Sequence, residues 1–146
     1  LYDSDGDRMK ATVRWNVERG RALTAADLTA AARLHAELGE RVVAFFERYD
    51  YLACPVTQVE PFRVETEYPQ AVAGVPMGSY LEWMRSCSRV TTMCCPAVSV
   101  PAGTSAAGLP VGLQLVAQPF AERALLEVAH AVDELTRYSN AMPPVE

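Results

Sequence analysis

The chain has 146 residues, half of them apolar, which is enough for one domain with a sizeable hydrophobic core. Its net charge of −5 and its scattered basic residues argue against a surface for nucleic acid or for an anionic membrane. No apolar run approaches the roughly 20 residues of a membrane helix, and no signal-peptide pattern occurs, so we expect a cytoplasmic protein.

The first third of the chain has helical periodicity. Residues 1–8 are polar and are expected to be irregular, whereas apolar residues repeat at helical spacing from Met9 to Gly20. A long helix is predicted over 24–48, where Thr24 and Asp27 resemble a capping box. One apolar stripe follows that box, formed by Leu28, Ala31, Ala32, His35, Leu38, Val42, Phe45 and Phe46.

The middle of the chain changes period. Residues 49–57, "YDYLACPVT", form a short apolar run that suits a buried strand. The segment 58–79 is rich in proline and glycine and is expected to be irregular. Residues 79–95 have helical spacing, with Ser79 as the N-cap and Pro96 as the stop.

Two strands and a helix are predicted at the end of the chain. Strands over 97–103 and 110–118 are joined by too short a link for a parallel crossover, so they should form an antiparallel hairpin. The path from strand 51–54 to strand 97–101 includes a helix and is compatible with a right-handed parallel crossover. The last helix, 120–138, has an apolar face of Leu125, Val128, Ala129, Val132 and Leu135. The fold class is therefore α/β, with a mixed β-sheet flanked by helices.

The residues alone display no complete catalytic set. The sequence has no G-x-S-x-G turn, and Ser79 is interpreted as a helix cap. His35 and His130 fall inside predicted helices, where packing is the simpler role. Cys94 and Cys95 lack metal-ligand spacing and are interpreted as small, reduced, apolar fillers. We therefore predict no metal and no cofactor.

Three segments together resemble the C-terminal third of the amidase-signature family. They are "DYLACPVT" from Asp50 to Thr57, "PAVSVPAG" from Pro96 to Gly103, and "GLPVGLQLV" from Gly108 to Val116. Their order and spacing agree with the family, and the resemblance covers roughly residues 10–138. The family often has Asn and Gly where this chain has Thr91 and Cys94, and this departure bears on the subfamily and the substrate.

The resemblance implies a serine hydrolase that cleaves carboxylic amides. The family's catalytic set is a lysine, a bridging serine in a cis peptide and a nucleophilic serine in a glycine-rich stretch, all upstream of the matching region. Lys10 is the single lysine of the chain, and no serine-rich turn lies near it. We therefore expect residues 1–146 to be the C-terminal portion of an amidase-signature domain, which supplies scaffold and part of the substrate pocket. The chain alone should be inactive, with no catalytic residue of its own.

The resemblance also places substrate-binding residues in this chain. Cys87, Val90 and Thr91 recur at spacings of three and four, so they share one helical face. The family places that helix near the substrate, and Thr57 ends a neighbouring strand. Core packing is the competing interpretation for Cys87 and Val90.

The resemblance finally predicts the partners of the chain. The substrate is a small-molecule amide, and no nucleic acid or membrane is involved. The strands would belong to a larger sheet, so the chain should form a homo-oligomer or associate with the missing N-terminal region. Two alternatives remain open: a non-catalytic binding module on the same scaffold, and a different α/β enzyme that uses Cys94 or Cys95.

Overall fold

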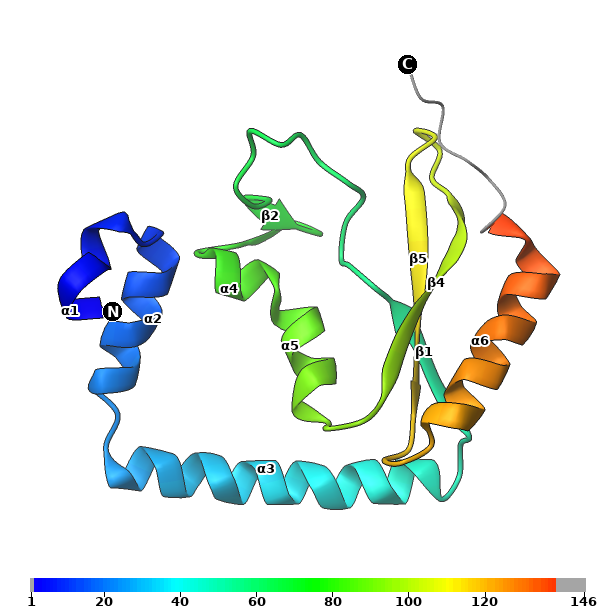
Figure 1. Ribbon diagram of the computed structural model, residues 1–146, viewed down its shortest axis with the longest axis horizontal. Helices are drawn as coiled ribbons and strands as arrows, with labels where there is room; N and C mark the ends of the chain where they lie inside the picture. Colours follow the sequence, from blue (N-terminus) through cyan, green and yellow to red (C-terminus); the bar gives the residue numbers. More distant parts are fainter. Residues whose placement is uncertain (1, 139–146) are drawn as a thin grey trace. The chain divides into compact units, whose positions relative to one another are not determined.

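The computed structural model describes residues 2–138, which divide into two compact units at Leu38 and Gly39. Figure 1 traces the elements along the chain, and α3 (Ala25–Phe46) runs through the division. Among the described residues, no helix combines the length and the apolar character needed to cross a membrane.

The N-terminal unit is helical from its first described residue. Its elements are α1 (Tyr2–Asp5), the 3-10 helix η1 (Gly6–Arg8), α2 (Ala11–Arg21) and the first part of α3. The prediction of an irregular segment before residue 9 is therefore wrong for residues 2–8. Polar contacts with α2 hold this segment, since the Tyr2 hydroxyl donates to Glu18 at 2.6 Å and Arg21 pairs with Asp3 at 3.0 Å.

The capping box at the start of α3 is confirmed. The Asp27 carboxylate accepts hydrogen bonds from the backbone N–H of Thr24 at 2.9 Å and from its hydroxyl at 2.6 Å. The Asp27 N–H donates back to the Thr24 hydroxyl at 3.2 Å. These bonds hold the pKa of the Asp27 carboxyl below its ordinary value of 3.8. Satisfied end groups of this kind fix where the helix begins.

Three strands form the main sheet of the C-terminal unit. They are β1 (Tyr51–Pro55), β4 (Ala97–Thr104) and β5 (Pro110–Ala117), arranged in the order β1-β5-β4. The predicted hairpin of β4 and β5 is confirmed as antiparallel. Strand β1 also pairs antiparallel with β5, so β1 and β4 run in the same direction with β5 between them.

The predicted helix over 79–95 is interrupted. The structure has α4 (Tyr80–Trp83) and α5 (Arg85–Thr92), separated at Met84. At the interruption, the carbonyl of Trp83 accepts a hydrogen bond from the side-chain amide of Gln58. Before α4, the segment predicted to be irregular contains a minimal hairpin of β2 (Ala71–Val72) and β3 (Val75–Pro76).

The core lies between the sheet and α6 (Glu122–Thr136), which covers one face of the strands (Figure 1). The central cluster consists of buried apolar side chains from β4, β5 and α6: Val100, Leu115, Ala117, Leu125 and Ala129. Val128 and Val132 pack against it, as the predicted apolar face of α6 requires. The prediction is wrong for Leu135, which lies in the last turn of α6 and is 85% exposed.

Candidate substrate site

A cavity of about 630 Å³ opens where β1 ends. Such a volume falls in the range of small-molecule sites, roughly 300–1,000 Å³. Four parts of the C-terminal unit form it: the end of β1 with the chain that follows, the start of β5, one residue of β4 and the end of α4. Its lining comprises Pro55, Val56, Thr57, Gln58, Val59, Glu60, Pro61, Phe62, Trp83, Ser99, Pro110, Val111 and Gly112.

The floor of the cavity depends on a glycine in the middle of the sheet. Gly112 lies on β5, and its carbonyl accepts a hydrogen bond from the Val56 N–H at 3.3 Å. A Cβ atom at Gly112 would lie 2.8 Å from Cγ2 of Val56 and 3.1 Å from the hydroxyl oxygen of Ser99. Only a residue without a side chain permits this approach, so Gly112 lets side chains from both neighbouring strands meet.

Two aromatic side chains form one wall. The rings of Phe62 and Trp83 lie 5.5 Å apart between centroids, in an edge-to-face arrangement with an interplanar angle of 77°. This geometry is favourable for aromatic pairs because the positive edge of one ring faces the negative face of the other. Phe62 comes from the proline-rich segment and Trp83 from α4, so the wall joins two parts of the chain.

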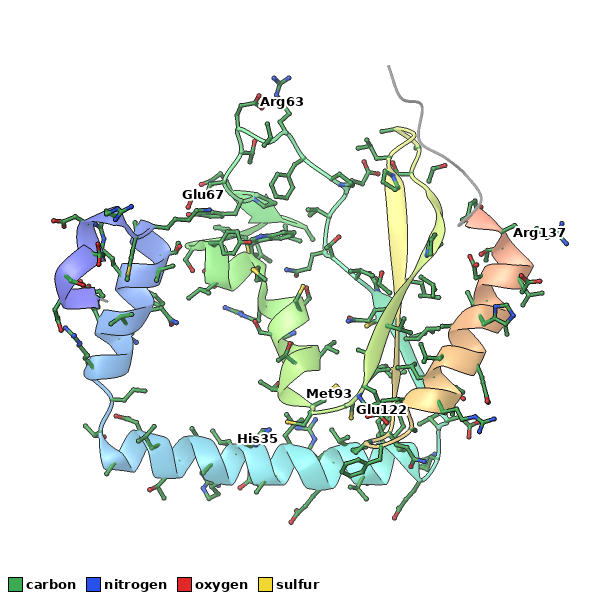
Figure 2. The ribbon with its side chains drawn as sticks, in the orientation of Figure 1. His35, Arg63, Glu67, Met93, Glu122 and Arg137 are labelled. Atoms are coloured by element: carbon green, nitrogen blue, oxygen red, sulfur yellow. The ribbon has the colours of Figure 1, made fainter. Side chains whose placement is uncertain are left out.

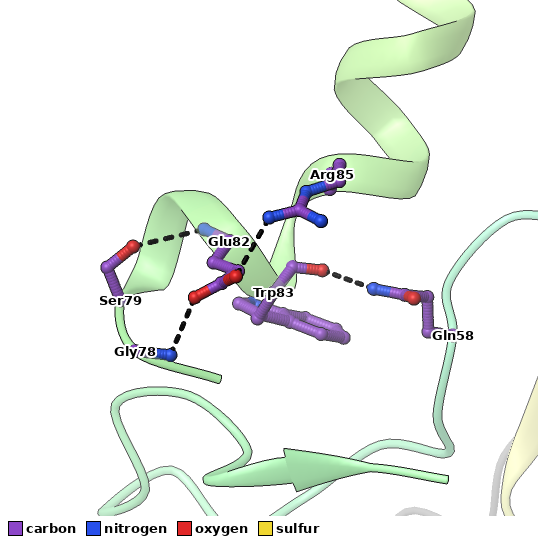
Figure 3. Close-up of polar contacts among 6 residues, drawn as sticks. All are labelled: Gln58, Gly78, Ser79, Glu82, Trp83 and Arg85. Carbon is purple, nitrogen blue, oxygen red and sulfur yellow. Dashed lines mark hydrogen bonds and ion pairs between the residues drawn. The ribbon is translucent and has the colours of Figure 1, made fainter. Parts of the chain in front are cut away.

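Hydrogen bonds on both sides of α4 hold Trp83 in place (Figure 3). The Ser79 hydroxyl accepts from the N–H of Glu82 at 3.2 Å, which confirms Ser79 as the N-cap. The Glu82 carboxylate accepts from the N–H of Gly78 at 2.8 Å and from Arg85 at 2.8 Å. On the far side, Gln58 donates to the Trp83 carbonyl at 2.5 Å. The indole is therefore carried by a short helix whose two ends are both tied down.

Thr57 is the one predicted substrate-binding residue that lines the cavity. It lies two residues beyond the end of β1, and its hydroxyl donates to the Val59 carbonyl at 2.8 Å. The hydroxyl oxygen keeps lone pairs that can accept a further hydrogen bond. Thr57 thus combines an exposed side chain with a fixed hydroxyl direction.

The other three predicted residues lie on α5, as their spacing indicates. The Cys87 thiol donates to the carbonyl of Val56 at 3.5 Å, which places it directly behind the cavity lining. Val90 is half-buried and Thr91 is exposed, with its hydroxyl donating to the Cys87 carbonyl at 3.2 Å. None of these three side chains belongs to the lining of this cavity.

The lining is mainly apolar, and Glu60 is its one ionisable residue. The nearby arginine of the proline-rich segment, Arg63, lies at the outer tip of that segment and pairs with Glu65 at 3.2 Å (Figure 2). Among residues 2–138, no cluster of three or more His, Cys, Asp or Glu side chains is arranged to hold a metal ion. The arrangement is therefore suited to the apolar part of a small organic molecule.

Two of the cysteines, Cys54 and Cys95, show no sign of an activated nucleophile. Burial is the main cause that raises the pKa of Cys54, with a smaller contribution from Cys87. Burial likewise raises the pKa of Cys95, again with a smaller contribution from its neighbour Cys94. A raised thiol pKa lowers the thiolate fraction at neutral pH, which is the opposite of what nucleophilic catalysis requires. The cysteine-enzyme alternative therefore gains no support from Cys95.

Sequence reasoning missed the aromatic wall. Phe62 lies in a segment predicted to be irregular, and Trp83 lies in a segment predicted to be one continuous helix. Composition offered one usable signal, since a tryptophan and a phenylalanine near a proline-rich loop are costly to leave in water. Periodicity does not show which aromatic side chains are in contact with one another.

Comparisons with known proteins agree with the three motifs. The family model for amidases matches residues 3–126. A glutamyl-tRNA(Gln) amidotransferase subunit from Moorella thermoacetica is 41% identical over 99 residues, which cover 67% of this chain and 19% of that protein. Fatty acid amide hydrolase of Medicago truncatula is 30% identical over 144 residues, which cover 98% of this chain and 23% of that protein.

A solved structure gives the same result for the fold. A bacterial aryl acylamidase of the amidase-signature family superposes with a TM-score of 0.84 at 19% identity, covering 99% of this chain and 31% of that chain. The α/β fold class is thereby confirmed. The chain spans about a fifth of the length of the two curated relatives. Since the family model matches most of its residues, the chain belongs to the amidase family, the amidase-signature enzymes.

Proposed function

We propose that residues 1–146 form the C-terminal portion of an amidase-signature domain that hydrolyses carboxylic amide C–N bonds. The observation that supports this most is the coincidence of motif and cavity. The segment that runs from β1 to Thr57 and the strand that begins at Pro110 belong to the three matching motifs, and both line the cavity. Motif residues that meet at an apolar cavity are what a substrate site in this family requires.

In this proposal the reacting groups come from outside these 146 residues. A nucleophilic serine attacks the amide carbonyl carbon, and its proton passes through a bridging serine to a neutral lysine. Backbone N–H groups of a glycine-rich turn stabilise the oxyanion. The C–N bond then breaks, the amine leaves with a proton, and water hydrolyses the acyl-serine ester to the carboxylic acid. The present chain supplies the scaffold and one wall of the pocket.

The proposed substrate-binding set is Thr57, Cys87, Val90 and Thr91. Thr57 would contact substrate within the cavity described above. Cys87 supports that cavity through its bond to Val56, and Val90 and Thr91 continue the same helix. They would extend the pocket once the remaining part of the domain is in place.

Exposed apolar side chains support the proposal that this chain is covered by more protein. On α3, Leu28 is 58% exposed, Leu34 57% and Val43 59%. They lie on different faces of α3, so together they leave apolar surface around much of the helix exposed. Either the N-terminal part of the domain or a second copy of the chain would cover them. Light scattering of the purified chain tests this, since a monodisperse monomer at 16.0 kDa would contradict both forms of association.

Activity measurements test the proposed reaction. The 146-residue chain should release no amine from aryl, aliphatic or glutamine amides, whereas a polypeptide extended upstream to include the lysine and serine stretch should do so. Replacing the nucleophilic serine by alanine in the longer polypeptide should abolish turnover. Hydrolysis by the 146-residue chain itself, blocked by a serine-directed inhibitor, would overturn the proposal that the catalytic residues lie outside this chain. The names of the two curated relatives refer to different substrates, a glutamyl-tRNA and a fatty acid amide.

A further inference from the structure

We infer that the cavity selects an apolar, uncharged amide over glutamine, and that Trp83 is the main specificity-determining residue. The inference rests on the proposed function, because it names the substrate class of the same site. It is carried by the composition of the cavity wall, by the packing of the indole against Phe62 and by the charges around the cavity.

The shape of the wall favours a flat or chain-like apolar group. Trp83 and Phe62 present a ring face and a ring edge nearly at right angles, with a centroid distance of 5.5 Å. Pro55, Pro61 and Pro110 add rigid apolar surface around them. An aryl ring or an alkyl chain placed here exchanges water for carbon contacts on several sides, which is the dominant favourable term for such groups. The amide and charged groups of glutamine gain nothing from these surfaces.

The charges around the cavity disfavour an amino acid. Glutamine carries a carboxylate that needs a cationic or multiple N–H partner when it leaves water. Within the described part of the chain, no lysine or arginine belongs to the lining, and the charged lining residue, Glu60, has the same sign as that carboxylate. Among the arginines nearest in sequence, Arg63 pairs with Glu65 and Arg85 with Glu82. A neutral amide avoids this repulsion.

Hydrogen bonds fix the backbone that carries Trp83, and the indole packs against the ring of Phe62. The Trp83 carbonyl is bonded to Gln58, and its helix is capped by Ser79 and braced by Glu82 (Figure 3). A preorganised side chain loses little conformational entropy when a ligand binds, so its contacts appear in the affinity. The same contacts would be weak if the indole were free to move away.

Binding to the 146-residue chain tests the inference without any need for turnover. The background variant is Trp15→Phe, which leaves Trp83 as the single tryptophan, since the sequence has two. Phenylacetamide and L-glutamine are titrated while Trp83 emission is followed, and calorimetry repeats both titrations. We expect saturable binding of phenylacetamide and at least about tenfold weaker binding of glutamine, which corresponds to one factor of ten in the dissociation constant.

Three variants link the preference to the wall. Trp83→Ala should weaken phenylacetamide binding at least about tenfold, and Trp83→Phe should keep most of it because an aromatic face remains. Phe62→Ala, at a side chain already 42% exposed, should weaken binding with little effect on folding. The matched control is Leu135→Ala, which removes an exposed apolar side chain of α6 outside the lining and should leave affinity unchanged.

Two binding results would overturn the inference: glutamine binding as tightly as phenylacetamide, or no saturable binding of phenylacetamide. It would also be overturned if Phe62→Ala, Trp83→Phe and a folded Trp83→Ala all bound phenylacetamide with the affinity of the background variant. Failure of the proposed function looks different. The longer polypeptide would then hydrolyse no amide, while the binding preference of the present chain would be unaffected. Turnover of glutamine in preference to phenylacetamide would leave the amidase proposal intact and overturn the inference alone.

Discussion

Replacing Gly112 by alanine should destabilise the C-terminal unit, because β5 approaches its neighbours too closely for a side chain. The new Cβ would meet Cγ2 of Val56 at 2.8 Å, which is closer than carbon atoms approach without displacement. Val56 is β-branched and stiff, so the backbone or the side chain must move. Overpacking of this kind costs about 1–3 kcal/mol, whereas the lower entropy of the unfolded alanine chain returns about 0.4–1 kcal/mol. The net loss of unfolding free energy should therefore lie between about 0 and 2.6 kcal/mol, with a central value of about 1.3 kcal/mol.

Urea unfolding followed by circular dichroism measures this loss, and the chain offers a matched control. Gly39 lies inside α3, where nothing is within 4 Å of an added Cβ. Gly39→Ala is the same chemical change in an open helical position, and it should stabilise α3 by about 0.5–1 kcal/mol. The two substitutions should thus have opposite signs.

A double-mutant cycle assigns the cost to one contact. In a Val56→Ala background the nearest clashing methyl group is gone, so Gly112→Ala should cost less than it does in the native chain. The native phenylacetamide affinity should also fall in Gly112→Ala, because Val56 lines the cavity. The reasoning is refuted if Gly112→Ala stabilises the chain as Gly39→Ala does, or if its cost is independent of Val56.

Three further measurements probe the ends of the helices and the thiols. Bonds from Thr24 lower the pKa of Asp27, so its contribution is present above the unfolded value of 3.8 and is lost as pH falls through the folded value. Helicity should therefore fall more between about pH 6 and pH 2.5 in the native chain than in Asp27→Asn, and parallel profiles would contradict the capping role. Ser79→Ala should lower the unfolding free energy by about 1 kcal/mol. The tryptophan emission of this variant should also shift to the red. Iodoacetamide at about pH 7.5 should modify exposed Cys94 before Cys95, whose pKa is raised by burial, and peptide mass mapping that finds the reverse order would refute this.

The sequence predicted best what depends on neighbours along the chain. The capping box of Thr24 and Asp27, the cap at Ser79 and the hairpin of β4 and β5 each follow from a few consecutive residues. The long α3 and the packing face of α6 follow from periodicity over several turns. These features need no knowledge of the rest of the fold, because hydrogen-bond geometry and turn length decide them locally.

The sequence predicted poorly what depends on contacts between distant segments. The interruption at Met84 lies beside a bond between Trp83 and Gln58, which lie 25 residues apart. The cavity likewise depends on Phe62 and Gly112, which no periodic pattern relates to one another. Propensity favours one continuous helix across Met84, and it contains no information about a tertiary contact at this point. Of the four predicted substrate-binding residues, one lines the cavity and three lie on α5 outside its lining, since spacing fixes a helical face but not what that face meets.

The apolar stripe of α3 is another pattern whose contacts the sequence does not specify. The face of α6 and the stripe of α3 have comparable patterns, yet the structure gives them different surroundings. Leu125 and Ala129 of α6 are buried against the sheet, whereas Val42 is the one buried residue of α3. A periodic pattern records that burial is favourable, and it does not say which surface provides it. Within the stripe of α3, Leu38, Phe45 and Phe46 are half-buried, whereas its first four members are exposed. The exposed part of the stripe is therefore a surface that the rest of an amidase domain or a second copy of the chain would cover. Light scattering tests this proposed association.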